Sequence, residues 1–306
     1  MTLAERRAAS SQFSGVELVA NTGTFYAEKG PRFDLALETL GNYATAGVPV
    51  VVVDSSHLKG HDWVAKELRR TGAVVKPAIV GGIASQRRQA AQYSLRHGAD
   101  AILSAEPEKD KMPNFVDDIT EALRTNDAVS IGRTEAAMQS LPPVQHRTEK
   151  LGGWVFQQLL DVPADPWSGG RAFTAEGAQS LITYPAGRPG MDNWIWLYDT
   201  MLGVQGRGMN IGSIAVDLMH PETMVTEETG NPVFDKKRYD QFDLQVRWAA
   251  KQPEVNTTEN GQAVSEIVMG TLQTLPEKPS NAQFEDAFSS MEEQFAPLGY
   301  QPPARQ

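Results

Sequence analysis

The sequence predicts an α/β fold in which a mostly parallel central sheet is flanked by helices. Through the first two-thirds of the chain, short β-branched runs alternate with segments whose apolar residues recur at helical spacing. The run at 48–53 is apolar at every position, which is typical of a strand that is buried on both faces of a parallel sheet. This alternation of strands and helices produces parallel strands covered by helices.

The elements follow one another in a regular order. Asn21 begins the loop after the first strand, and Pro113 opens a helix at a position where its missing N–H costs nothing. Ligands of such sheets bind beyond the carboxyl ends of the strands, so the loops after these ends form the candidate active face. We expect strands at 16–20, 48–53, 73–75, 101–104 and 128–131, and helices at 33–46, 61–70, 84–97 and 113–123.

The pattern becomes mainly helical from residue 142 onward. A turn-rich loop at 165–170 is the main interruption, and one further strand is expected at 209–216. We therefore predict a main domain at 1–225 and a helical C-terminal extension at 226–306 that packs on it, with a partly disordered tail. The helices of this half are expected at 149–160, 192–202, 236–251, 261–275 and 283–295.

Composition narrows the class of protein. The 306 residues are 41% hydrophobic and 22% charged, which is ordinary for a globular protein. The net charge of -10 disfavours nucleic acid as a partner, and the absence of cysteine excludes disulfides and thiolate catalysis. The N-terminus lacks the apolar centre of a signal peptide, and no apolar run is long enough to span a membrane. We expect a soluble, cytoplasmic protein.

The most informative segment follows the strand at 101–104. Glu106 and Glu108 lie two residues apart directly after the strand, and Pro113 then opens a helix. Paired carboxylates at a strand end suit Mg²⁺ or Mn²⁺ bound to a diphosphate, whose developing charge the metal offsets as the nucleotide departs. A solvated acidic loop is the alternative explanation of the same residues.

This layout resembles the GT-A glycosyltransferases of the family-2 type. In that family a strand ends in an Asp-x-Asp motif, and a Pro and an aromatic residue then open a helix; here Glu106-Pro107-Glu108 precedes Pro113 and Phe115. Glutamate stands where the family has aspartate, and Asp110 could substitute as a ligand. The resemblance implies the GT-A nucleotide-diphospho-sugar transferase fold, with 1–225 as the nucleotide-sugar-binding and catalytic domain.

Segments on the nucleotide side agree with the resemblance in their order along the chain. Asp54 ends the second strand, where the family uses an aspartate to contact the nucleobase or ribose, and Asn21 and Thr22 follow the first strand. The resemblance implies that these three residues hold the nucleoside. Arg87 and Arg88 lie in a segment that resembles the family's helix beside the diphosphate, so the resemblance implies that one of them could bind phosphate bidentately.

The distal half also resembles the mannosylglycerate-synthase-type enzymes. Gly169 and Gly170 resemble the glycine loop that borders the donor sugar and acceptor in the GT-A glycosyltransferases. In the mannosylglycerate-synthase-type enzymes a histidine after the last strand completes the metal site, and here His220 follows that strand. The resemblance therefore implies His220 as a third metal ligand, although a histidine before Pro221 could also simply cap the strand. Asp192 opens a helix and is the candidate catalytic residue: it serves as general base in an inverting enzyme, orients substrate in a retaining one, or acts as an N-cap.

Together with the resemblance, these residues lead us to expect a glycosyltransferase that uses Mg²⁺ or Mn²⁺ to move a sugar from a UDP- or GDP-linked donor to a hydroxyl acceptor. The alternative is a GT-A protein that has lost catalysis and binds a nucleotide or a partner. A nucleotidyltransferase is disfavoured because residues 21–30 hold only two glycines, and a dehydrogenase because the Gly-x-Gly-x-x-Gly spacing is missing. The sequence allows a homo-oligomer and names neither the base, the sugar, the acceptor nor the stereochemical outcome.

Overall fold

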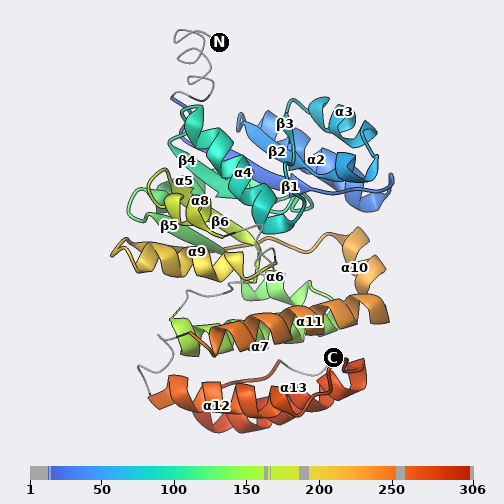
Figure 1. Cartoon of the computed structure of the whole chain (residues 1–306), viewed down its shortest axis with the longest axis vertical. Helices are drawn as coiled ribbons and strands as arrows, with labels where there is room; N and C mark the ends of the chain where they lie inside the picture. The colour runs from blue at the N-terminus through green and yellow to red at the C-terminus, as the bar shows by residue number, and fades with distance from the viewer. Residues whose placement is uncertain are drawn as a thin grey trace. The chain divides into compact units, whose positions relative to one another are not determined.

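The computed structural model describes residue 13, residues 15–161, 165, 167–185, 193–252 and 259–303 (Figure 1). The chain forms two compact units, which are described separately. Unit 1 comprises Met1–Arg133 and Ser168–Pro221, and unit 2 comprises Thr134–Trp167 and Glu222–Gln306. The second unit thus includes a stretch of chain that the sequence assigned to the main domain.

Unit 1 is built on a sheet whose strands lie in the order β3-β2-β1-β4-β6-β5-β7. Neighbouring strands are parallel, except that β6 runs antiparallel to both β4 and β5. This mostly parallel sheet confirms the predicted fold class. The strands are β1 (Val19–Thr24), β2 (Val50–Asp54), β3 (Val74–Pro77), β4 (Ala101–Ser104), β5 (Ala128–Arg133), β6 (Gly170–Thr174) and β7 (Ile211–Val216).

Helices cover both faces of this sheet. Alternate residues of β2 therefore pack in two different hydrophobic clusters. Val50 and Val52 pack in the cluster that contains apolar residues of α2 (Pro31–Thr45), α3 (Trp63–Arg69) and α5 (Val116–Leu123). Val51 and Val53 pack in the cluster that contains Ala90 of α4 (Ile83–Arg96), which lies along β1, β2 and β4 (Figure 1). The continuous apolar run of this strand therefore has the cause that the sequence suggested. The other α-helices in the described part of unit 1 are α8 (Gln179–Thr183) and α9 (Trp196–Gln205).

Two strands differ from the prediction. β1 begins at Val19, so Asn21 and Thr22 lie inside the strand and not in the loop after it. β6 was not predicted, because its glycine-rich approach and its short length are typical of a loop. The strand is stable because it pairs on both sides, with Ser104 opposite Arg171 and Ile131 opposite Gly170.

Unit 2 is a set of helices packed around aromatic residues. α7 (Pro143–Leu160) lies beside α11 (Pro232–Ala249) and contacts α12 (Glu259–Gln273), and α13 (Asn281–Phe295) packs on α11 and α12 (Figure 1). The rings of Phe242 and Phe288 lie 4.3 Å apart between centroids, which joins α11 to α13. Two shorter helices are α6 (Glu135–Gln139) and α10 (Glu222–Glu228).

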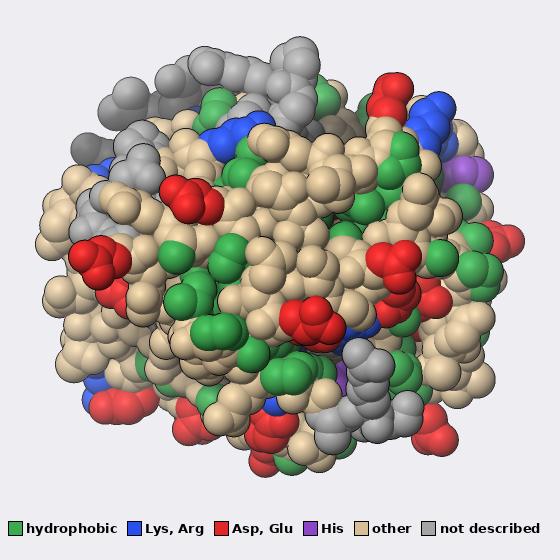
Figure 2. All heavy atoms as spheres, turned by 90° about the horizontal axis from the view of Figure 1, so that it is seen from below, with side chains coloured by type: hydrophobic (Ala, Val, Ile, Leu, Met, Phe, Trp, Pro, Cys, Tyr) green, Lys and Arg blue, Asp and Glu red, His purple; other side chains and the backbone are tan. Residues whose placement is uncertain are grey.

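The surface reflects the acidic composition. Asp and Glu side chains are spread over the face shown in Figure 2, and Lys and Arg side chains are sparse there, in keeping with the net charge of -10. The described helices include none with the length and hydrophobicity that a membrane crossing requires.

Candidate active site at the carboxyl edge of the sheet

The predicted site segments of the described chain meet at one edge of unit 1. β1, β2 and β4 are parallel neighbours, so their carboxyl ends at Thr24, Asp54 and Ser104 lie along the same edge. β6 runs the other way, so its first residue, Gly170, lies at this edge too. β7 is parallel to β5 and ends at Val216, shortly before His220. Residues far apart in the sequence are thereby brought to one side of the sheet.

Two carboxylates stand at the tip of β4. Glu106 forms an ion pair with Lys109 at 3.4 Å, and the hydroxyl of Tyr26 donates a hydrogen bond of 2.7 Å to Oε1 of Glu108. Burial, and then the negative charge of Glu106, raise the pKa of the Glu108 carboxyl above its usual value. Burial and the neighbouring Glu108 also raise the pKa of the Tyr26 hydroxyl. Burial and the adjacent Glu106 thus both oppose the ionised form of Glu108.

A hard divalent cation fits this pair, because Mg²⁺ and Mn²⁺ prefer carboxylate oxygens and a cation would offset the charge that opposes ionisation of Glu108. His220 is buried and follows β7 at the same edge. Within the described ranges, however, no group of three or more His, Asp or Glu side chains is arranged to hold a metal ion, so the three predicted ligands do not form a finished shell. Asp110, the substitute ligand, pairs with Lys111 at 2.9 Å.

Asn21 and Thr22 are buried within β1. The side-chain oxygen of Asn21 accepts a hydrogen bond of 2.8 Å from the hydroxyl of Ser94 on α4. The Thr22 hydroxyl is buried and has no hydrogen-bond partner in the described structure. In this structure the Asn21 side chain connects β1 to α4 through its hydrogen bond with Ser94. Contact of Asn21 or Thr22 with a nucleoside stays a prediction.

Asp54 organises two loops. Its Oδ1 accepts hydrogen bonds from the hydroxyls of Thr24 at 3.0 Å and Ser56 at 2.6 Å, and from the backbone N–H of Ser56 at 3.2 Å. Only 1% of the residue is exposed. Asp54 therefore links the end of β1 to the turn after β2, and its predicted contact with the nucleobase or ribose is not tested by these contacts.

The two candidate phosphate-binding arginines differ in their surroundings. Arg87 is 1% exposed, and its guanidinium donates to the backbone carbonyls of Asn21 and Ala105, so it joins the middle of β1 to the residue that follows β4. Burial lowers its pKa to about 10, against the opposing effect of Glu106 and Glu108. Arg88 is only half-buried and donates to the carbonyl of Tyr184 at 3.0 Å. Arg88 is thus the less enclosed of the two.

The predicted glycine loop lies directly against the acidic tip. Gly169 has a φ of 80°, in the region that side chains rarely adopt, and a Cβ there would lie 3.3 Å from Cδ of Glu106. Gly170 begins β6 opposite Ile131, and the hydroxyl of Ser168 donates to the carbonyl of the same isoleucine. The loop is therefore held close to Glu106 by its pairing with β5.

Asp192, the predicted catalytic residue, lies outside the described residues. The next residue, Asn193, stabilises the turn that precedes α9: its Oδ1 accepts a hydrogen bond of 2.8 Å from the backbone N–H of Ile195. The roles predicted for Asp192 stay predictions.

Sequence reasoning missed two residues of this edge, Tyr26 and Lys109. Tyr26 lies two residues beyond the end of β1, and Lys109 follows Glu108 directly. An aromatic residue just past a strand end, and a lysine within an acidic loop, were signals available in the sequence. Neither identified a partner, because Tyr26 and Glu108 are 82 positions apart.

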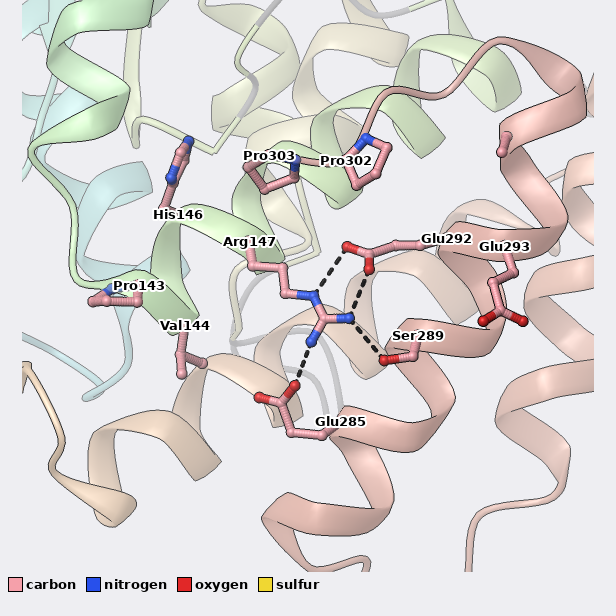
Figure 3. Close-up of a pocket in the computed structure, with 11 residues that line it drawn as sticks. Pro143, Val144, His146, Arg147, Glu285, Ser289, Glu292, Glu293, Pro302 and Pro303 are labelled. Atoms are coloured by element: carbon pink, nitrogen blue, oxygen red, sulfur yellow. Dashed lines mark hydrogen bonds and ion pairs between the residues drawn. The ribbon is translucent and has the colours of Figure 1, made fainter. Parts of the chain in front are cut away.

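Unit 2 has a cavity of its own, of 590 Å³, between α7, α13 and the prolines at 302 and 303 (Figure 3). At its centre the guanidinium of Arg147 donates to Glu292, Ser289 and Glu285 (Figure 3). Because two carboxylates already neutralise this arginine, the cavity lacks the cationic character that a diphosphate requires. The candidate donor site is therefore the edge of the sheet in unit 1.

No protein-family model matches this chain, and no curated protein matches it by sequence. Solved structures do match. A mannosyltransferase from Pyrobaculum calidifontis, PcManGT, solved in complex with GDP-Man and Mn²⁺, superposes with a TM-score of 0.51 at 15% identity, covering 93% of this chain and 76% of the other. Glucosyl-3-phosphoglycerate synthase from Mycobacterium tuberculosis superposes with a TM-score of 0.48 at 14% identity, over 81% of this chain and 84% of the other. Residues 1–349 of TarS from S. aureus superpose with a TM-score of 0.44 at 11% identity, over 93% of each chain. The sheet order and the match to the mannosyltransferase show that the chain has the GT-A fold of the nucleotide-diphospho-sugar transferases.

Proposed function

We propose that this protein is a glycosyltransferase that moves a sugar from a UDP- or GDP-linked donor to a hydroxyl acceptor, with Mg²⁺ or Mn²⁺ as cofactor. The observation that carries the proposal is the carboxylate pair at the tip of β4, which lies against the loop at Gly169 on the carboxyl edge of a GT-A sheet. Ligands of open α/β sheets bind at this edge. The mannosyltransferase that superposes on this chain was solved in complex with GDP-Man and Mn²⁺, which suggests the donor and metal to test first.

The proposed roles are distributed among residues along the carboxyl edge of the sheet. Glu106 and Glu108 would hold the cation, with His220 as the proposed third ligand, and the cation would supply charge stabilisation for the departing nucleoside diphosphate. Arg88 is the less enclosed of the two arginines and is the one that we assign to the phosphate oxygens. Gly169 would border the donor sugar. The nucleoside would lie over the ends of β1 and β2; Asp54 is the last residue of β2, and Asn21 and Thr22 lie within β1.

Asp192 would serve the acceptor. In transfer, the acceptor oxygen forms a bond to the anomeric carbon while the bond from that carbon to the phosphate oxygen breaks, and the hydroxyl proton has to leave. We propose that the Asp192 carboxylate takes this proton if the enzyme inverts, and orients the acceptor if it retains configuration. Asp192→Asn in the transfer assay tests the role: donor binding should persist while transfer falls, and unchanged transfer would remove Asp192 from the site.

The decisive experiment is the replacement of Glu108 by Ala. Loss of one carboxylate removes a cation ligand, so transfer should fall by roughly 100-fold or more, because the metal supplies several kcal/mol of charge stabilisation. Purified protein is incubated with UDP- and GDP-sugars and a panel of hydroxyl acceptors, with and without Mn²⁺, and product is quantified by mass spectrometry. Glu121→Ala is the matched control: this side chain is 71% exposed on α5, and transfer should not change. Full activity in the Glu108 variant would contradict the assignment.

The second candidate is a protein that binds a nucleotide without turning over a sugar. Two observations favour it: glutamates stand where the resembling family has aspartates, and the described residues contain no three-ligand metal group. Metal-dependent hydrolysis of the donor without acceptor separates the two functions. Hydrolysis supports the enzyme, whereas nucleotide binding with no hydrolysis of any donor supports the binding protein.

A further inference from the structure

We propose that Tyr26 is a positioning residue for the cation site: its hydroxyl holds the Glu108 carboxylate in the orientation that binds the metal. The inference rests on the proposed function and adds a residue that does not itself touch the metal. Its hydroxyl lies 2.7 Å from Oε1 of Glu108. This contact joins the loop after β1 to the loop after β4, so the two loops that border the site are tied together at the carboxylate.

Tyr26 is itself fixed at both ends. Its ring packs edge-on against Phe33 of α2, with centroids 5.2 Å apart, and Phe33 packs against Trp63 of α3 at 5.0 Å. Its backbone N–H donates a hydrogen bond of 2.9 Å to the hydroxyl of Ser56, which in turn donates to Asp54 at 2.6 Å. The tyrosine therefore cannot swing without disturbing α2 and the turn after β2.

The flexibility of a glutamate side chain explains why the hydrogen bond from Tyr26 matters for metal binding. A glutamate has one more rotatable bond than an aspartate, so an unrestrained Glu108 would occupy several orientations and lose more freedom when it binds a cation. A carboxylate has two oxygens, and a hydrogen bond to Oε1 restrains the group without using both. Carboxylates that bind metals are commonly hydrogen-bonded by neighbouring groups, whose removal lowers metal affinity by about 10–100-fold.

The partner glutamate has a separate restraint. Glu106 pairs with Lys109, which is only 6% exposed, at 3.4 Å. Each carboxylate of the pair is thus contacted by a different side chain. We expect loss of the Tyr26 hydroxyl to affect the Glu108 half of the site and to leave the Glu106 half in place.

The test is Tyr26→Phe, which removes the hydroxyl and keeps the ring against Phe33. Mn²⁺ binding to the full chain is measured by electron paramagnetic resonance of free Mn²⁺, with UDP or GDP present and absent. We expect Mn²⁺ affinity in the presence of nucleotide to fall by about 10–100-fold. Metal-free nucleotide affinity and the melting temperature should stay close to those of the unmodified protein. Ser56→Ala, which loosens the backbone anchor of Tyr26, should give a smaller loss in the same direction.

Tyr43→Phe is the matched control, because the Tyr43 hydroxyl is buried on α2 and has no hydrogen-bond partner in the described structure. Its Mn²⁺ affinity should not change. If Tyr26→Phe binds Mn²⁺ as well as the unmodified protein does, the positioning role is overturned and the proposed function stands. If Tyr26→Phe has a lower nucleotide affinity and a lower melting temperature as well as a lower Mn²⁺ affinity, the role of the tyrosine is structural and the inference is again overturned. An unmodified protein that binds no Mn²⁺ with either nucleotide contradicts the metal-dependent function itself, and the inference with it.

Discussion

Glu108 is harder to ionise than an ordinary glutamate, because burial and the charge of Glu106 both oppose its negative form. The same two causes make the site responsive to a cation, which would relieve the repulsion. In the absence of metal, ionisation of Glu108 lowers the free energy of unfolding.

This predicts how the stability of the metal-free protein changes with pH. The folded state holds a proton on Glu108 at pH values above 4.5, where the unfolded chain has begun to release it. The contribution of Glu108 is therefore fully present below that value and is lost as pH rises through the raised folded-state pKa. Glu108→Gln cannot ionise and should lack this loss. Thermal melts in a chelator across mildly acidic to neutral pH would show it, and parallel curves for the two proteins would argue against it.

The candidate site could be predicted in part at the level of single residues. The spacing of Glu106 and Glu108 directly after a strand predicted a cation site, because hard divalent cations prefer carboxylate oxygens as ligands. Asp54 and Arg87 were also identified by position, but the contacts that they make, with Ser56 and with backbone carbonyls, depend on burial that one sequence does not reveal. The hydrogen bond between Tyr26 and Glu108 could not be predicted from the sequence, because the two residues lie on different loops.

Secondary-structure elements followed the sequence where periodicity was strong. α2 and α4 begin and end within two residues of the predicted helices, and β4 spans the predicted range. β6 was missed because a strand of five residues that starts with glycine has too little pattern to be recognised. Its existence depends on hydrogen bonds to β4 and β5, which are tertiary interactions.

One helix packs too closely to accept an added methyl group. A Cβ on Gly152 of α7 would lie 2.4 Å from the ring of Trp167, which stacks on Phe242 of α11. Gly152→Ala should therefore destabilise unit 2 by about 1–3 kcal/mol, the usual range for overpacking. Gly270→Ala on α12 meets nothing within 4 Å and should instead stabilise its helix by up to about 1 kcal/mol. Urea unfolding of both variants measures the difference, and equal effects would show that the ring can move aside.

At the scale of the molecule, all the predicted donor-binding, metal-binding and catalytic positions fall in the ranges of unit 1. The sequence predicted the sheet and its class, because strand and helix alternation is a local signal. It placed the boundary between the parts near residue 225, whereas α7 groups with the C-terminal helices. That grouping depends on contacts between segments far apart in the chain, which periodicity does not contain.

Because the predicted site residues all lie in unit 1, ligand binding should slow amide hydrogen exchange in only part of the chain. A nucleoside diphosphate with Mn²⁺ should slow amide hydrogen exchange at the ends of β1, β2 and β4, because binding stabilises the native form of the segments that it contacts. Amides of α12 and α13 should exchange at unchanged rates. Mass spectrometry of exchanged peptides measures both. Protection confined to the C-terminal helices would locate the ligand elsewhere.

The division of unit 2 into two sequence pieces bears on any attempt to shorten the protein. A chain cut after residue 225 retains every strand of the sheet, yet it deprives α7 of α11 and α12, the helices on which it packs. Because α7 carries buried apolar residues, among them Leu151, Val155 and Phe156, removal of its two partner helices would expose apolar surface to water. A minimal soluble fragment has to keep the C-terminal helices, even though the predicted chemistry does not draw on them.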